Sequence, residues 1–243
     1  MIDHHDADLT GSRFRNVNLS RSEFRGVVFS DVAITGAWMQ DVRIEGRVAT
    51  LSVNGVDVTA FVEAELDRRH PERLRLQPDD ADGVRQAWNE AVARAEEVLA
   101  RARQLPANML DERVNGEFSF LQTVRHLVFA ADRWLTGPVF GDPPPYFHPL
   151  GQPHDGALEG PADGIESGAR PSLDEVVVMR RDHQQRVEGY LRTITDPELR
   201  RVVASPNGGE TTVLLCLHVV LFEEWWHHQY ATRDLAILEA RQH

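Results

Sequence analysis

The first part of the chain repeats a hydrophobic pattern every five residues. From Leu9 onward every fifth residue is large and apolar, and the residue two places before each is small or β-branched. The large residues are Leu9, Phe14, Leu19, Phe24, Phe29, Ile34, Met39 and Ile44. A period of five fits neither the 3.6-residue turn of a helix nor the two-residue alternation of a strand. The pattern predicts a chain that turns a corner every five residues and points two of them inward.

This repeat resembles the pentapeptide-repeat family, in which a central Leu or Phe follows a small residue two places earlier. The resemblance implies a short right-handed quadrilateral β-helix with four pentapeptides per coil. Eight pentapeptides over residues 7–46 would make about two coils. Stacked repeats need covering at their ends. We expect that cover from a hairpin around Asn54-Gly55, within 48–58, and from a helix that Thr59 caps and that ends near Arg69.

From Asp80 onward the hydrophobic period is helical. Four long segments show it: 81–103, 117–136, 172–194 and 211–240. Ser172 and Glu175 form a capping box at the start of the third segment. Four helices of similar length predict a four-helix bundle. The predicted fold is therefore a multi-part α plus β chain, a β-helix with its capping hairpin and helix over 1–79 and an α-helical bundle over 80–243.

Two segments between these elements are rich in Pro and Gly or polar residues. Residues 70–80 have the composition of a linker, and residues 137–171 form a long loop between the second and third helices. A loop of that length in a compact domain is usually functional or mobile. It contains His148 and His154, for which solvated surface positions are the more frequent outcome.

Composition excludes several classes of function. All 26 basic residues are Arg, 38 residues are acidic, and the net charge is −12. This charge disfavours a broad nucleic-acid surface and binding to anionic membranes. With no lysine, Schiff-base and P-loop lysine mechanisms are excluded. The single cysteine, Cys216, and the lack of a long apolar run predict a cytoplasmic protein. Arg in place of Lys suggests a GC-rich bacterial genome.

The fourth helical segment pairs Glu with His one turn apart. Glu224 and His228 fall within the apolar stripe of Leu214, Leu217, Leu221, Ala231, Leu235 and Leu238. Buried charge is costly unless it is paired or bound to a metal, and this spacing lets both side chains share one ion. His126 on the second helix is the best third ligand, although on a helical wheel it lies away from the apolar stripe of its own helix.

Two other interpretations of this segment stay open. Glu223 and His227 have the same spacing, but their stripe reaches Asp234, so the sequence favours the Glu224/His228 register. Either pair is also compatible with a simple ion pair on a helix, without a metal.

Residues 80–240 resemble the DinB-like superfamily of bacterial four-helix-bundle proteins. Two motifs carry the resemblance, Val124-Arg125-His126-Leu127 on the second helix and Glu223-Glu224-Trp225-Trp226-His227-His228 on the fourth. The family holds a divalent metal, often zinc or nickel, with one His from the second helix and a His-x-x-x-His pair on the fourth. Here Glu replaces the first His, as in the thiol-dependent isomerase branch that uses mycothiol.

The resemblance implies a metal with three protein ligands, for which the sequence favours His126, Glu224 and His228, and with one position open for water or a substrate thiol. Three functions follow for comparison. The first is a thiol-dependent transferase, or a hydrolase, acting on a small-molecule substrate. The second is an interaction or scaffold protein whose repeat docks or forms a homodimer. The third is a structural bundle with a vestigial or regulatory site. Mimicry of DNA is disfavoured, because residues 1–47 carry six Arg against seven acidic residues.

Overall fold

The computed structural model describes residues 4, 7–24, 26–46, 48–154 and 163–242. Its contacts divide the chain into two compact units. We call Met1–Leu66 with His154–Pro161 the repeat unit, and Asp67–Pro153 with Ala162–His243 the helical unit. The division falls inside helix α1 (Thr59–Arg69), which has the bounds that the sequence predicts.

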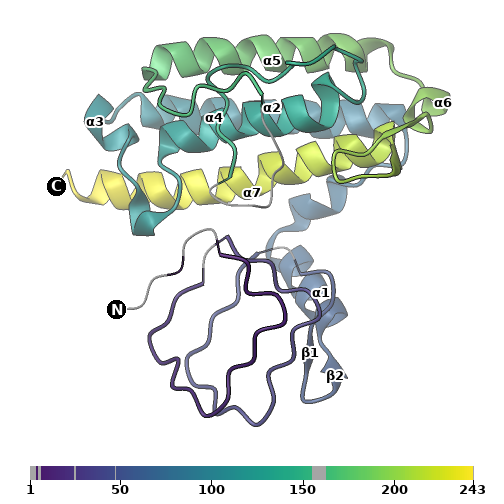
Figure 1. Cartoon of the computed structure of the whole chain (residues 1–243). Helices are drawn as coiled ribbons and strands as arrows, with labels where there is room; N and C mark the ends of the chain where they lie inside the picture. Colours follow the sequence, from purple (N-terminus) through teal and green to yellow (C-terminus); the bar gives the residue numbers. More distant parts are fainter. Residues whose placement is uncertain (1–3, 5–6, 25, 47, 155–162, 243) are drawn as a thin grey trace. The chain divides into compact units, whose positions relative to one another are not determined.

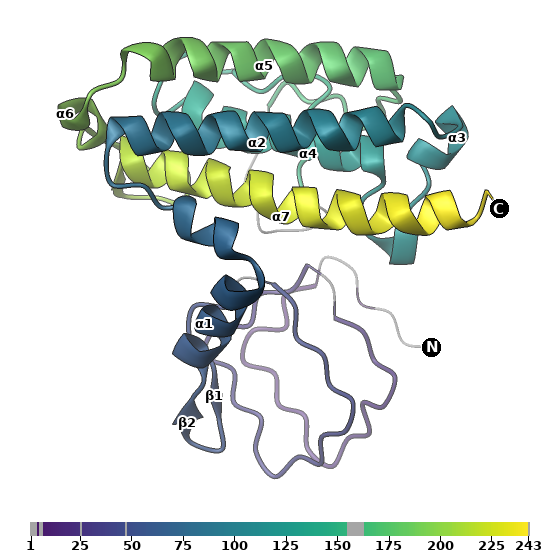
Figure 2. The same cartoon turned by 180° about the vertical axis from the view of Figure 1, so that it is seen from behind.

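Four long helices build the helical unit (Figure 1). They are α2 (Ala81–Ala102), α4 (Phe120–Ala131), α5 (Leu173–Thr193) and α7 (Val213–Ala240). Helices α2 and α4 each pack against both α5 and α7, and Figure 2 shows the four from behind. The helical domain predicted for the C-terminal part is confirmed, and each long helix lies inside the segment predicted for it.

Caps fix where these helices begin. The Ser119 hydroxyl accepts a hydrogen bond from the backbone N–H of Gln122, and the Gln122 side chain accepts one from the backbone N–H of Ser119. Ser172 and Glu175 form the predicted capping box in the same way. Helix α4 runs into a π-helical turn, η3 (Asp132–Thr136). Such turns often mark functional positions in helices.

Short elements complete the helical unit. They are η1 (Pro71–Arg75), α3 (Ala107–Leu110), η2 (Val114–Gly116), α6 (Asp196–Leu199) and the antiparallel pair β3 (Val202–Ala204) and β4 (Glu210–Thr212). Two clusters of buried apolar side chains fill the unit, one around Trp225 and Leu217, the other around Val128 and Leu235.

Residues 70–80, expected to be a linker, pack onto α7. The indole N–H of Trp225 donates to Glu72 over 3.0 Å, and the guanidinium of Arg73 lies 5.4 Å from the centre of the Trp225 ring. Leu76 is buried in the core. The sequence did not reveal this docking because its anchor is a tryptophan about 150 residues away.

The repeat unit keeps its period of five in the backbone. A positive φ recurs at Gly11, Asn16, Arg21, Gly26, Asp31, Gly36, Asp41 and Gly46, each two residues after a large apolar side chain. Glycine, Asn and Asp tolerate this conformation best, so seven of the eight corners have a suitable residue.

No closed β-helix is present in the described part of residues 7–46. This stretch contains bends and turns but no strand, and its large apolar side chains stay exposed, as with Phe14 at 65%. A coil that does not close cannot bury its inward set. The predicted hairpin is formed by β1 (Ser52–Val53) and β2 (Val56–Asp57). Across the described residues, no helix has the length and apolarity needed to span a membrane.

Gly189 in α5 gives a direct test of helix packing. A Cβ built at this exposed position meets no atom within 4 Å. Because glycine in a helix interior costs roughly 0.5–1 kcal/mol relative to alanine, Gly189→Ala should stabilise the helical unit by about that amount. Urea unfolding measures the change. Gly83→Ala is the matched control, since a Cβ there lies 2.7 Å from the Cβ of Pro78 and should destabilise. Stabilisation by both variants would contradict this packing.

Candidate metal centre

A carboxylate on α7 lies between two imidazoles. Oε2 of Glu223 is 3.2 Å from Nε2 of His227, one turn further along the same helix. The same oxygen is 3.7 Å from Nε2 of His126 on α4. The two imidazole rings are tilted relative to each other, with centroids 4.8 Å apart. Packing of α4 against α7 therefore brings three ligand-type side chains to one place.

A contact on the ring nitrogen that does not face Glu223 fixes the orientation of His126. Its Nδ1 lies 2.7 Å from the backbone carbonyl of Gln152, which only accepts hydrogen bonds, so Nδ1 carries the hydrogen. This leaves Nε2 directed at Glu223 as a possible ligand atom. The ring is 1% exposed and packs against Phe118 and Phe129. An outer partner on the far ring nitrogen is the usual arrangement of a metal-binding histidine.

Electrostatics keep the Glu223 carboxylate ionised. Burial raises the pKa of Glu223, but hydrogen bonding to His126 and His227 and their nearby charge outweigh burial and hold this pKa well below its ordinary value. An ionised carboxylate beside two imidazoles is a ligand set that suits zinc and related divalent ions.

The interatomic distances also fit a metal. With metal–ligand bonds of about 2.1 Å, neighbouring ligand atoms of a tetrahedral zinc site lie about 3.4 Å apart. The 3.2 and 3.7 Å separations around Glu223 bracket that value. The Glu223 carboxylate therefore lies at a ligand-like distance from each of the two imidazoles.

Among the described residues of the helical unit, His126 and Glu223 have ligand atoms within 4.8 Å of one another. His227 is the further ligand-type side chain that the helical unit places on Glu223.

Comparison with known proteins identifies the family of the chain. The model of the DinB superfamily matches residues 90–231, more than half of the 243-residue chain. The chain belongs to the DinB superfamily. Its members bind metals and are often thiol-dependent. The pentapeptide-repeat model matches residues 5–46 with eight copies. No curated protein and no solved structure matches the chain significantly. We call the helical unit the DinB unit from here on.

The Glu224/His228 pair that the sequence favours lies in different surroundings. Glu224 is buried, as its apolar stripe predicts, but its carboxylate accepts a hydrogen bond from Arg180 on α5. His228 is half-buried and faces α2, and burial together with the charge of Arg94 lowers its pKa. The structure thus brings His126 to the other register, Glu223 and His227.

Packing on several sides of α7 explains this difference. The helix contacts both α2 and α4, so Glu224 and His227 are both buried although they lie on different faces. One apolar stripe cannot describe such a helix. Arg180, which neutralises Glu224, was also missed. The only sequence signal for it is its place in the core stripe of α5, between Val176 and Gln184.

Two arginines of α4 and the π-helical turn after it hold neighbouring loops in place. Arg125 is buried and donates to the carbonyls of Leu150, Ala169 and Gly151. Burial, followed by the charge of Arg170, lowers the pKa of Arg125. Arg133 donates to Asn207 in the turn between β3 and β4. Arg125 thus clamps the long loop onto α4.

Cys216 should be unreactive in the native DinB unit. It is fully buried, and burial raises the pKa of its thiol to about 11. At pH 8 about one thiol in a thousand would be thiolate, so a chromogenic disulfide reagent should react only after unfolding. The rate in native protein against the rate in urea measures this. Prompt reaction of the native thiol would contradict its burial.

Proposed function

We propose that the DinB unit binds one zinc or nickel ion through His126, Glu223 and His227. The proposal is carried by the position of the Glu223 carboxylate, which lies between the two imidazoles at ligand-like distances. The predicted four-helix bundle is the scaffold of this proposal, since α4 and α7 each supply ligands from neighbouring faces.

We further propose a thiol-dependent reaction on a small-molecule substrate, a transferase with a low-molecular-weight thiol such as mycothiol. A divalent ion in this site would favour the thiolate form of a bound thiol at neutral pH and leave one position open beside three protein ligands. The protein's own residues hold that geometry. Gln152 orients His126, and Phe118 and Phe129 shield it from water.

The first experiment is metal analysis of tag-free full-length protein purified without chelator. We expect about one ion per chain, or uptake of one zinc or nickel ion when the protein is incubated with either. His227→Ala should lose the ion, and His228→Ala is the matched control that should keep it. Loss in His228→Ala with retention in His227→Ala would overturn the ligand set. Loss in His154→Ala alone would do the same.

The thiol part of the proposal has its own readout. Cobalt(II) in the same site should develop a thiolate-to-metal charge-transfer band when a cysteine-based low-molecular-weight thiol is added. Methylation of that thiol's sulfur is the control, and the methylated compound should give no band. A cobalt spectrum that the free thiol leaves unchanged would contradict thiol dependence while leaving metal binding intact.

The repeat unit supports a second function, docking of another copy of this chain. Its apolar side chains, such as Phe24 and Phe29, are more than half exposed although they recur with strict period. Burial against a second copy would remove this surface from water. Size-exclusion chromatography with light scattering of the full chain should give a dimer, and Phe24→Asp with Phe29→Asp a monomer. A monomer in both cases would overturn docking by a second copy.

A cytoplasmic location completes the proposal, supported by the single cysteine.

A further inference from the structure

A second polar cluster lies outside the metal ligands, at the π-helical turn that ends α4. Asp132 is 1% exposed and begins this turn. Its Oδ1 accepts from the Thr136 hydroxyl at 2.8 Å and lies 2.9 Å from Nε2 of His183 on α5. Its Oδ2 accepts from the backbone N–H of His148, in the long loop, at 2.8 Å. One buried carboxylate therefore joins α4, α5 and the loop.

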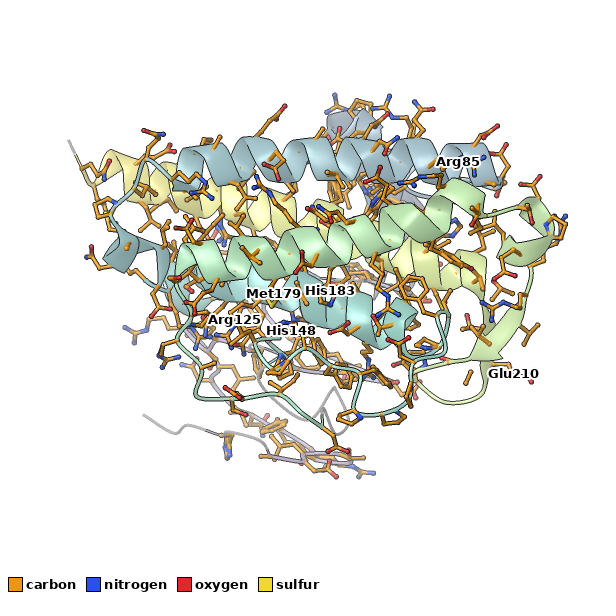
Figure 3. The ribbon with its side chains drawn as sticks, turned by 90° about the horizontal axis from the view of Figure 1, so that it is seen from above. Arg85, Arg125, His148, Met179, His183 and Glu210 are labelled. Carbon is orange, nitrogen blue, oxygen red and sulfur yellow. The ribbon has the colours of Figure 1, made fainter. Side chains whose placement is uncertain are left out.

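His183 is held on both sides of its ring. Nε2 faces Asp132, and Nδ1 lies 3.0 Å from the backbone carbonyl of Met179. Both partners are oxygen atoms that accept hydrogen bonds, so contacts on both ring nitrogens fix the orientation of His183. Figure 3 shows Met179 and His183 on α5 beside His148 of the loop.

The loop segment from His148 to Gln152 is short and internally braced. The N–H of Gly151 donates to the carbonyl of His148 at 2.8 Å, and the N–H of Leu150 donates to Nδ1 of His148 at 3.1 Å. Burial, and then the charge of His183, lowers the pKa of His148, which keeps its ring an acceptor. Nε of Arg125 donates a hydrogen bond to the Leu150 carbonyl at 2.7 Å.

This segment connects the second cluster to the metal ligand. Its first residue, His148, is fixed to Asp132, and the carbonyl of its last residue, Gln152, accepts from Nδ1 of His126 at 2.7 Å. We propose that Asp132 and His183 are positioning residues for His126, and that they act through the His148–Gln152 segment. The inference rests on the proposed metal site. It adds the residues that hold the Gln152 carbonyl, which is the hydrogen-bond partner of His126, in place.

The physical reason is the orientation of an imidazole. Without the carbonyl of Gln152, the hydrogen of His126 can move to Nε2 and the ring can rotate, so Nε2 is no longer ready to bind. Loss of an outer partner typically costs about 10- to 100-fold in metal affinity. Asp132→Asn leaves one acceptor oxygen where the carboxylate has two, so it cannot keep both the contact with the His148 N–H and the contact with the Thr136 hydroxyl and His183 as they are. It should therefore release the loop.

The test uses the full-length protein and zinc as the probe. Competition with a chromophoric chelator measures zinc affinity, and hydrogen exchange of metal-free protein measures protection of the Gly151 and Gln152 amides. Asp132→Asn should lower zinc affinity about 10-fold or more and speed exchange at both amides. His183→Ala removes one of three partners of Asp132 at a position that is 16% exposed, so it should fold and show a smaller loss of both kinds.

Asp142→Asn is the matched control, because Asp142 ties the same loop to α5 through Arg186 at a more exposed point, at 2.7 Å. It should leave zinc affinity unchanged. Unchanged affinity in folded Asp132→Asn, or in His183→Ala if the first variant does not fold, would overturn the inference alone. A loss equal to theirs in Asp142→Asn would also overturn it. No zinc binding by the unsubstituted protein would overturn the proposed function and this inference with it.

Discussion

Glu223→Gln should abolish tight metal binding while the fold persists. The amide has the size of the carboxylate but no charge, and it leaves the two imidazoles without the anion that lies between them. The loss of zinc affinity should exceed the roughly 10- to 100-fold that removal of an outer partner costs. Metal analysis and chelator competition measure the loss, and circular dichroism checks the helices.

Glu224→Gln is the control for this variant, because it makes the same chemical change one residue further along α7. Glu224 pairs with Arg180, so the Glu224→Gln variant should be less stable than the unsubstituted protein. Its zinc affinity should stay close to that of the unsubstituted protein. The reverse result, with zinc lost from Glu224→Gln and kept by Glu223→Gln, would restore the register that the sequence favours.

Arg180→Met should be among the most destabilising substitutions in the DinB unit. Arg180 and Glu224 are both almost fully buried, with side chains 2% and 3% exposed. Methionine fills much of the space but leaves the carboxylate without a counter-charge, which typically costs about 3–5 kcal/mol. The free energy of unfolding in urea should fall by that amount.

Two companion variants isolate the charge. Arg180→Met combined with Glu224→Leu removes both charges, and replacing a whole buried pair with apolar residues is often neutral or stabilising, so most of the loss should be recovered. Arg181→Met, the neighbouring position, breaks an exposed pair with Glu96 and should cost less than about 1 kcal/mol. A single Arg180→Met variant as stable as Arg181→Met would contradict this account of the core.

Local signals in the sequence predicted the long helices of the DinB unit and the hairpin of the repeat unit. The capping box at Ser172, the helical period and the turn at Asn54-Gly55 depend on neighbours within a few residues. The docking of residues 70–80 onto Trp225 depends on a contact across the chain, so composition alone suggested a linker. In the repeat unit the period of five was visible, but whether the coil closes depends on stacking that the period does not encode.

The sequence indicated the residue types of the proposed metal centre, and the structure places His126 beside Glu223 and His227 rather than beside Glu224 and His228. His126 was found from its motif, although its helical wheel argued against burial. Residues 120–131 of α4 are almost all buried, because α5, α7 and the loop segment ending at Gln152 cover this helix on several sides. Packing on several sides of α7 likewise places the buried Glu224 against Arg180 of α5 and places Glu223 beside the two imidazoles. A wheel drawn for one helix cannot show which neighbour each face meets.

The most direct test of the central claim is the position of a zinc ion in crystals of the zinc-loaded full-length protein. Anomalous difference density measured on both sides of the zinc edge locates that ion and identifies it as zinc. We predict a single strong peak in the DinB unit, bonded to His126, Glu223 and His227. A peak at Glu224 and His228, or no peak in protein saturated with zinc, would contradict the claim.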